Sequence, residues 1–99
     1  MRLTPAQIER IRSLVTELAG AQATVRLFGS RLDDSARGGD VDLLIEVVEP
    51  VDEPALLAAR IAGRVSRLLD GRKVDVVLAA PNLKELPIHH VARREGIVL

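Results

Sequence analysis

The chain has 99 residues, a length that predicts one domain, residues 1–99, with a modest core. Fourteen basic residues balance fourteen acidic ones, so the sequence lacks the broad positive field with which proteins bind long nucleic acids non-specifically. It has no cysteine, which excludes disulfides and thiolate metal sites. Its start has no apolar run of signal-peptide or membrane length, so we expect a cytoplasmic protein that does not bind membranes.

The first predicted helix follows Thr4, which is a good N-cap because Gln7 three residues later completes a capping box. Apolar residues then recur at helical spacing until Gly20 ends the helix. A short strand is predicted over Val25–Phe28, followed by a polar, glycine-rich loop over residues 30–39. The second predicted strand is Val41–Val48, which is strongly apolar.

The second half of the chain predicts a long amphipathic helix that Asp52 caps and that ends at Asp70-Gly71. A third strand is predicted over Lys73–Leu78. A short helix over Ile88–Glu95 and a small final strand over Ile97–Leu99 complete the chain. The predicted order of elements is therefore helix, strand, loop, strand, helix, strand, helix, strand.

The second strand, the long helix and the third strand form a crossover unit, and such units make their two strands parallel. Asp42 opens one strand and Asp75 lies early in the other, so we expect these two residues to lie close together. The period of two along a strand puts Asp40, Asp42 and Leu44 on one face of the sheet and an apolar set on the other. The predicted class is α/β, a two-layer α+β arrangement in which a small mixed sheet carries its helices on the apolar face.

Three carboxylates at one edge of a sheet, Asp40, Asp42 and Asp75, repel one another and raise at least one pKa unless a cation neutralises them. Magnesium suits such a site because it takes a few carboxylates and leaves its other positions for water and phosphates. The Gly29-Ser30 turn offers backbone amides and a hydroxyl that can bind a phosphate. Together these groups favour nucleotide phosphoryl chemistry.

The spacing of these motifs is distinctive. Gly29-Ser30 is followed by nine residues and then by Asp40-Val41-Asp42, and Asp75 lies on the strand after the next helix. This arrangement resembles the signature of the polymerase beta-like nucleotidyltransferase superfamily, in which ten residues more often separate the serine from the first aspartate. A chain of this length resembles the minimal nucleotidyltransferases (MNT) within it, which are commonly antitoxins of HEPN-domain ribonuclease toxins. The resemblance extends over nearly the whole chain and implies the fold of that superfamily.

The resemblance also implies roles for single residues. Asp40 and Asp42 would bind two magnesium ions, and Asp75 would complete the site of the ion that activates the attacking hydroxyl. Gly29 and Ser30 would hold the terminal phosphates of the nucleotide, with assistance from Arg31. ATP would be the substrate, and a tyrosine of a HEPN toxin would accept the AMP. The chain has no tyrosine, so such an acceptor must lie in another molecule.

Simpler interpretations stay open for the same residues. Asp40 and Asp42 can belong to a solvated turn before an exposed strand position, and Asp75 can be a solvated edge residue. A rival function is a binding module that neutralises its partner by association alone. Transfer to a small molecule such as an aminoglycoside usually requires a further domain for the acceptor, and this chain ends at Leu99. Both a homo- and a hetero-oligomer are compatible with the sequence.

Two further features are interpreted as surface features. His89 and His90 are adjacent on a predicted helix and point about 100° apart, so they cannot share a ligand face, and a surface or partner-contact role is expected. Arg60, Arg64 and Arg67 form one basic stripe on the long helix. That stripe is either a solvated face or a docking site for an acidic partner.

Overall fold

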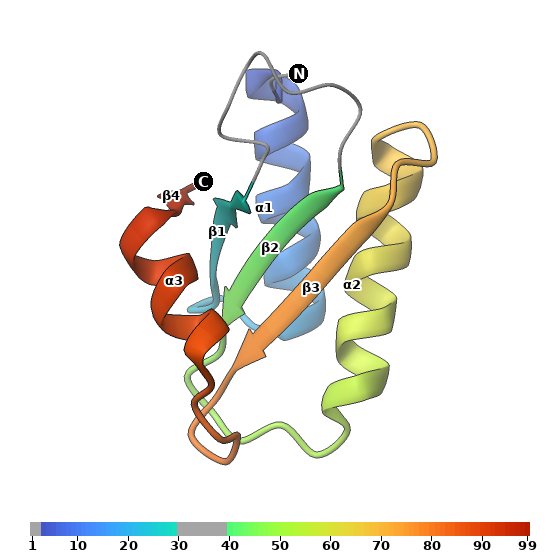
Figure 1. Ribbon diagram of the computed structural model, residues 1–99. Helices are drawn as coiled ribbons and strands as arrows, with labels where there is room; N and C mark the ends of the chain where they lie inside the picture. Colours follow the sequence, from blue (N-terminus) through green and yellow to red (C-terminus); the bar gives the residue numbers. More distant parts are fainter. Residues whose placement is uncertain (1–2, 30–39) are drawn as a thin grey trace.

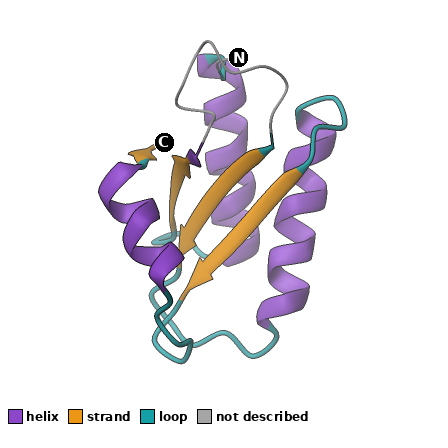
Figure 2. Ribbon diagram, in the orientation of Figure 1, coloured by secondary structure: helices purple, strands orange, loops and turns teal. Residues whose placement is uncertain are grey.

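The computed structural model describes residues 3–29 and 40–99. In these ranges three helices and four strands form a layered α+β structure (Figure 1, Figure 2). The elements in chain order are α1 (Pro5–Ala19), β1 (Thr24–Phe28), β2 (Val41–Glu46), α2 (Pro54–Leu68), β3 (Val74–Ala79), α3 (Pro87–Glu95) and β4 (Ile97–Val98).

The four strands form one mixed sheet in the order β3-β2-β1-β4. β1 is antiparallel to both β2 and β4, whereas β2 and β3 run parallel, as the crossover rule predicts. The parallel register pairs Asp42 with Asp75. The predicted α+β class with a small mixed sheet and the predicted proximity of these two aspartates are therefore confirmed.

α1 and α2 cover one face of the sheet and enclose the main core. The capping box at the start of α1 forms as predicted, because the Gln7 N–H donates to Thr4 Oγ1 at 3.1 Å and the Thr4 N–H donates to Gln7 Oε1 at 2.8 Å. The helices contribute Ile11 and Ile61, and β2 contributes Leu43, all with no exposed surface. Burial of this apolar face orients the alternate residues of β2, including Asp42, towards the opposite face.

The start of α2 differs from the prediction that Asp52 caps it. Pro54 is the first helical residue, so the cap position is Glu53, and its side chain makes no capping hydrogen bond. The segment before the helix is held by Asn82 instead. The Asn82 amide donates to the Val51 carbonyl at 2.8 Å, and its Oδ1 accepts from the Val51 N–H at 2.9 Å.

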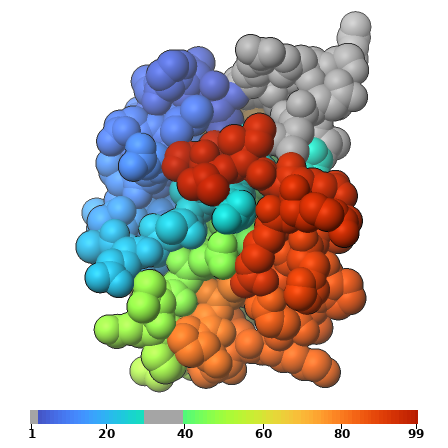
Figure 3. Space-filling model, turned by 90° about the vertical axis from the view of Figure 1, so that its left-hand side faces the viewer, coloured from blue at the N-terminus to red at the C-terminus, as the bar shows by residue number. Residues whose placement is uncertain are grey.

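α3 lies on the face of the sheet opposite α1 and α2, whereas the sequence predicted helices on one face only (Figure 1). It closes a second, smaller cluster in which Ala92 packs with Phe28 and Leu44 of the sheet. Leu44 was expected on an open face but has no exposed surface. Figure 3 shows α3 and β4 side by side against the rest of the molecule, and β4 pairs with β1.

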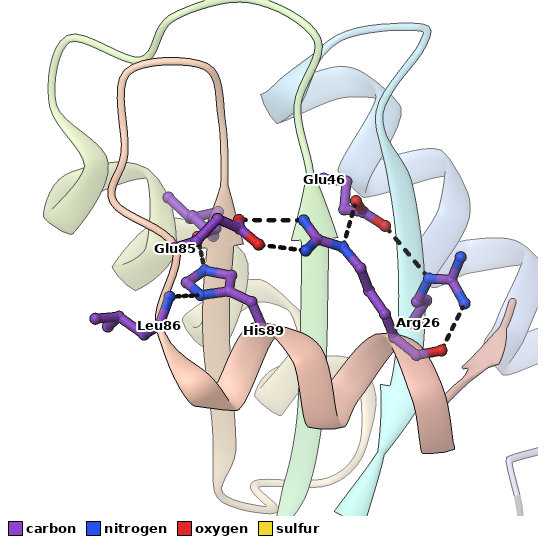
Figure 4. Close-up of polar contacts among 7 residues, drawn as sticks. Arg26, Glu46, Glu85, Leu86 and His89 are labelled. Atoms are coloured by element: carbon purple, nitrogen blue, oxygen red, sulfur yellow. Dashed lines mark hydrogen bonds and ion pairs between the residues drawn. The ribbon is translucent and has the colours of Figure 1, made fainter.

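Polar contacts fix α3 to the end of the sheet away from the paired aspartates (Figure 4). The Glu46 carboxylate accepts hydrogen bonds from Arg26 at 3.3 Å and from Arg93 at 3.1 Å, and Arg93 also pairs with Glu85. We call these four residues the Glu46 network. Hydrogen bonding to Glu85, and then to Glu46, raises the pKa of Arg93.

His89 is buried, which corrects the expected surface role. Its Nδ1 accepts from the Leu86 N–H at 2.9 Å, so the proton is on Nε2, which donates to the Leu78 carbonyl at 2.8 Å (Figure 4). Both ring nitrogens are thus engaged by backbone groups. His89 joins the start of α3 to β3 and has a structural role, whereas His90 is exposed.

No helix among the described residues has the length and apolar character needed to cross a membrane. The cytoplasmic location stays a prediction.

Candidate active site

The candidate site lies where β1 ends and β2 and β3 begin. These three strand ends meet at one edge of the sheet because β1 is antiparallel to β2 and β2 is parallel to β3 (Figure 1). Asp42 is the central residue of this edge, since its register partners are Phe28 on β1 and Asp75 on β3. Asp40 immediately precedes β2, so all three predicted carboxylates belong to this edge.

Gly29 is in direct contact with the Asp42 carboxylate. Its φ of 81° lies in the region that L side chains rarely adopt, and a Cβ at this position would overlap Asp42 Oδ2. A glycine is therefore required both by the backbone conformation and by the close approach of the carboxylate. The turn predicted to bind phosphates begins beside the central aspartate.

The pKa of Asp42 is raised above its ordinary value. Burial of the carboxyl group is the largest cause, and the charges of Asp75 and then Asp40 add to it. The expectation that clustered carboxylates raise at least one pKa is confirmed, although desolvation contributes more than repulsion. The charge of Lys73 acts in the opposite direction.

Lys73 is a residue of this edge that the sequence interpretation did not select. Its Nζ lies 3.5 Å from Asp40 Oδ2, and the side chains of this ion pair are 70% and 46% exposed. The signal was present in the sequence, because Lys73 precedes Asp75 by two positions and so belongs to the same face of the strand. Asp40 thus forms an exposed ion pair with a lysine of the same chain.

The three aspartates are neighbours without forming a compact ligand cluster. Within residues 3–29 and 40–99, no group of three or more His, Cys, Asp or Glu side chains is close enough together to hold a metal ion. Asp40 is turned to Lys73, and Asp75 is exposed. Ser30 and Arg31, the other predicted phosphate-binding residues, lie outside the described residues.

Comparison with protein families identifies the family of the chain. The sequence profile described as the nucleotidyltransferase domain matches residues 8–97, which includes every element of the fold except the first residues of α1 and the last of β4. The chain belongs to the nucleotidyltransferase domain family. No curated protein matches it.

Nucleotidyltransferase domains transfer nucleotidyl groups and usually use a nucleoside triphosphate with a divalent metal. The donor set of this edge fits such a metal, because carboxylate oxygens are the ligands that Mg²⁺ prefers. A bound cation would also offset the burial and the repulsion that raise the pKa of Asp42. A metal at Asp40 would share this carboxylate with Lys73 or displace the lysine.

Proposed function

We propose that this nucleotidyltransferase is a magnesium-dependent antitoxin that transfers AMP from ATP to a tyrosine of a HEPN ribonuclease toxin. One observation carries the catalytic part: Asp42 and Asp75 are direct register partners on parallel strands, so that their like charges repel each other. Like charges at one sheet edge are costly in the folded protein unless a bound cation offsets them. The family match supports transfer of a nucleotidyl group.

The proposed roles of single residues are those that the resemblance to the superfamily implies. Asp40 and Asp42 would hold two magnesium ions, and Asp75 would complete the site of one of them. The chemistry supplied by bound magnesium is a lowered pKa of the attacking hydroxyl and neutralisation of the pyrophosphate that leaves. Gly29 allows the backbone of the turn to approach the phosphates, with Ser30 and Arg31 as further phosphate contacts.

The reaction forms one bond and breaks one. The acceptor oxygen bonds to the α-phosphorus of ATP, the bond from that phosphorus to the bridging oxygen breaks, and pyrophosphate leaves with the electron pair. The hydroxyl proton passes to solvent. The acceptor must be another molecule if it is a tyrosine, since the chain contains none.

Lys73 contributes a positive charge that can serve two states. In the metal-free protein its ammonium group pairs with Asp40. If Asp40 held a metal, the Lys73 ammonium could pair with the phosphates of a nucleotide bound beside it. We therefore propose that the Lys73 ammonium compensates the charge of the carboxylates before the nucleotide binds and the charge of the phosphates afterwards.

The alternative is a non-catalytic antitoxin that neutralises its partner by association alone. Two observations favour it: Asp40 pairs with Lys73, and the described residues hold no three-ligand metal cluster. Under this alternative the carboxylate edge has no role in neutralisation. The two functions therefore differ in whether ATP and the aspartates are needed.

A transfer assay separates the two functions. The chain is coexpressed with the product of its neighbouring reading frame and incubated with Mg²⁺ and ATP labelled at the α-phosphate. Asp75→Asn removes one exposed charge and leaves the packing of Val74 and Val76 against the helices intact. We expect the two proteins still to associate and labelling of the partner to fall by at least about 10²-fold.

Glu9→Gln is the matched control, because Glu9 is an exposed carboxylate on α1 that pairs only loosely with Arg12, at 3.8 Å. Its labelling should equal that of the wild type. Neutralisation that is equally strong without ATP, and in the Asp75 variant, would establish the binding module and refute the enzyme.

A further inference from the structure

A groove runs between α1 and α2, on the side of these helices that faces away from the sheet. Its first part has a volume of about 380 Å³, and a second part of about 340 Å³ shares Arg64 and Arg67 with it. The two helices run antiparallel beside each other (Figure 1). Leu14 and Leu68 line the first part and Leu18 the second, so the groove has apolar as well as charged walls.

The charged lining of the groove is strongly basic. It consists of one glutamate, Glu17, and four arginines, which are Arg10, Arg60, Arg64 and Arg67. Glu17 pairs with Arg64 at 3.0 Å, and among the described residues this is the only ion pair that any of the four arginines makes. The whole chain has a formal net charge of zero, so the positive charge here is a local concentration and not a general property of the surface.

Gly63 leaves open space on this surface. It lies inside α2 and lines the second part of the groove, and a Cβ at this position would meet nothing within 4 Å. Alanine would therefore fit, and it would stabilise the helix because glycine is a poor helix former. The glycine is unfavourable for the isolated chain but allows another backbone to approach α2 closely.

We propose that the groove binds an acidic, amphipathic helix of a partner protein. Arg60, Arg64 and Arg67 follow one helix face, so acidic residues at the same spacing on a facing helix would meet them. Each wall is a helix of 15 residues, which is about 22 Å long and matches a partner helix of four turns. Leu18 and Leu68, which are partly exposed, would contact its apolar side.

A nucleic acid fits this groove less well than an acidic helix. Single strands are usually bound by basic grooves that also offer aromatic side chains for base stacking. The only aromatic residue of the chain, Phe28, is buried in the cluster under α3. The groove therefore offers charge and apolar contact but no stacking.

The groove and the carboxylate edge are separate surfaces. α1 and α2 pack on one face of the sheet, whereas Asp42 and Asp75 belong to the other. A partner helix in the groove would leave the carboxylate edge uncovered. This inference therefore does not depend on catalysis, and it holds for either proposed function.

Peptide binding measured by fluorescence anisotropy tests the inference. The probe is a labelled, stapled helical peptide of four turns, with glutamates on one face spaced as Arg60, Arg64 and Arg67 are and leucines beside them. A scrambled peptide of equal composition and a single-stranded RNA dodecamer are the other arms. We expect saturable binding of the acidic helix only, weakened by added salt.

The variants make the test specific. Arg60→Glu with Arg67→Glu reverses two exposed charges and should weaken binding at least about tenfold. Arg94→Glu, an equally exposed change on α3, should have no effect. Gly63→Ala should stabilise the free protein and weaken binding. No saturable binding, equal binding of the scramble, tighter binding of the RNA, or equal loss in the Arg94 variant would each overturn the proposal.

Discussion

Two carboxylates of β2, Asp42 and Glu46, point to the same face of the sheet four positions apart and have opposite surroundings. Glu46 lies between Arg26 and Arg93, within 3.3 Å of each, so its charge is compensated inside the fold. Asp42 has the aspartates 40 and 75 as its charged neighbours, with Lys73 as the compensating cation, and its pKa is raised.

The difference shows that one strand can carry a stabilising carboxylate at one end and a candidate ligand-binding carboxylate at the other. The Glu46 network joins β1, β2 and α3 and holds α3 onto the sheet. The Asp42 end of β2 contributes less to the stability of the fold, because burial and like charges both disfavour the ionised form of Asp42. Groups that cost stability in this way are typical of sites that bind a ligand of opposite charge.

The largest expected effect is on transfer in Asp42→Asn. The change removes the central carboxylate of the edge and keeps its size, so we expect labelling of the partner to fall by at least about 10²-fold. Glu46→Gln, the equivalent change at the other end of β2, should keep transfer within about twofold of the wild type. If both variants lose transfer alike, the two ends of the strand do not have separate roles.

Gly29→Ala should give the next largest effect. An alanine at a positive φ costs about 1–2 kcal/mol, and here its Cβ also displaces the Asp42 carboxylate. Gly71→Ala is the matched control, because its φ of 84° is close to the 81° of Gly29 and its Cβ would meet nothing within 4 Å. In urea titrations Gly29→Ala should lose about 1 kcal/mol more than Gly71→Ala. Equal losses would show that the contact with Asp42 has no consequence.

Glu46→Gln should lower the free energy of unfolding by about 1–2 kcal/mol, because it removes the counter-charge of the partly buried Arg26 and leaves Arg93 with Glu85 alone. Glu9→Gln should cost less than about 0.5 kcal/mol, since the Glu9–Arg12 pair is exposed. The measurement is chemical denaturation of the three proteins in one buffer. A loss in Glu46→Gln no larger than that in Glu9→Gln would remove the structural role of the network.

The smallest expected effect is a pH dependence. Because the pKa of folded Asp42 is raised above 3.8, the metal-free folded protein holds this proton more tightly than the unfolded chain does. The stability that protonated Asp42 contributes is present below pH 3.8 and is lost as the pH rises through the folded pKa.

Asp42→Asn cannot ionise at this position. The free energy of unfolding of Asp42→Asn, relative to the wild type, should therefore increase over this pH range and stay constant above it. Denaturation at a series of pH values without metal checks this difference. A difference that decreases with pH would mean that the pKa of Asp42 is lowered.

Local patterns in the sequence were sufficient for much of the fold. The capping box at Thr4 and the ends of the strands depend on neighbouring residues, and the pairing of Asp42 with Asp75 follows from the handed crossover. Lys73 could have been found by the period of two along β3. The carboxylate edge was thus largely predictable.

The position of α3 was not predictable from the same sequence patterns. The only buried residues of α3 are His89 and Ala92, so its sequence shows no wide apolar face. The partners of Glu46 are 20 and 47 positions away in the chain, and His89 is satisfied by backbone groups, which no side-chain pattern reveals. The position of α3 depends on ion pairs between residues distant in the chain and on hydrogen bonds between His89 and backbone groups.

The central claim is that the carboxylate edge binds a magnesium nucleotide, and thermal unfolding of the chain with Mg²⁺ and a non-hydrolysable ATP analogue tests it most directly. A ligand that binds only the folded state raises the melting temperature by mass action. The account predicts a saturable rise in the wild type and in Glu46→Gln, and none in the double variant Asp40→Asn with Asp42→Asn, which stays folded. A double variant that keeps the full rise would contradict the account.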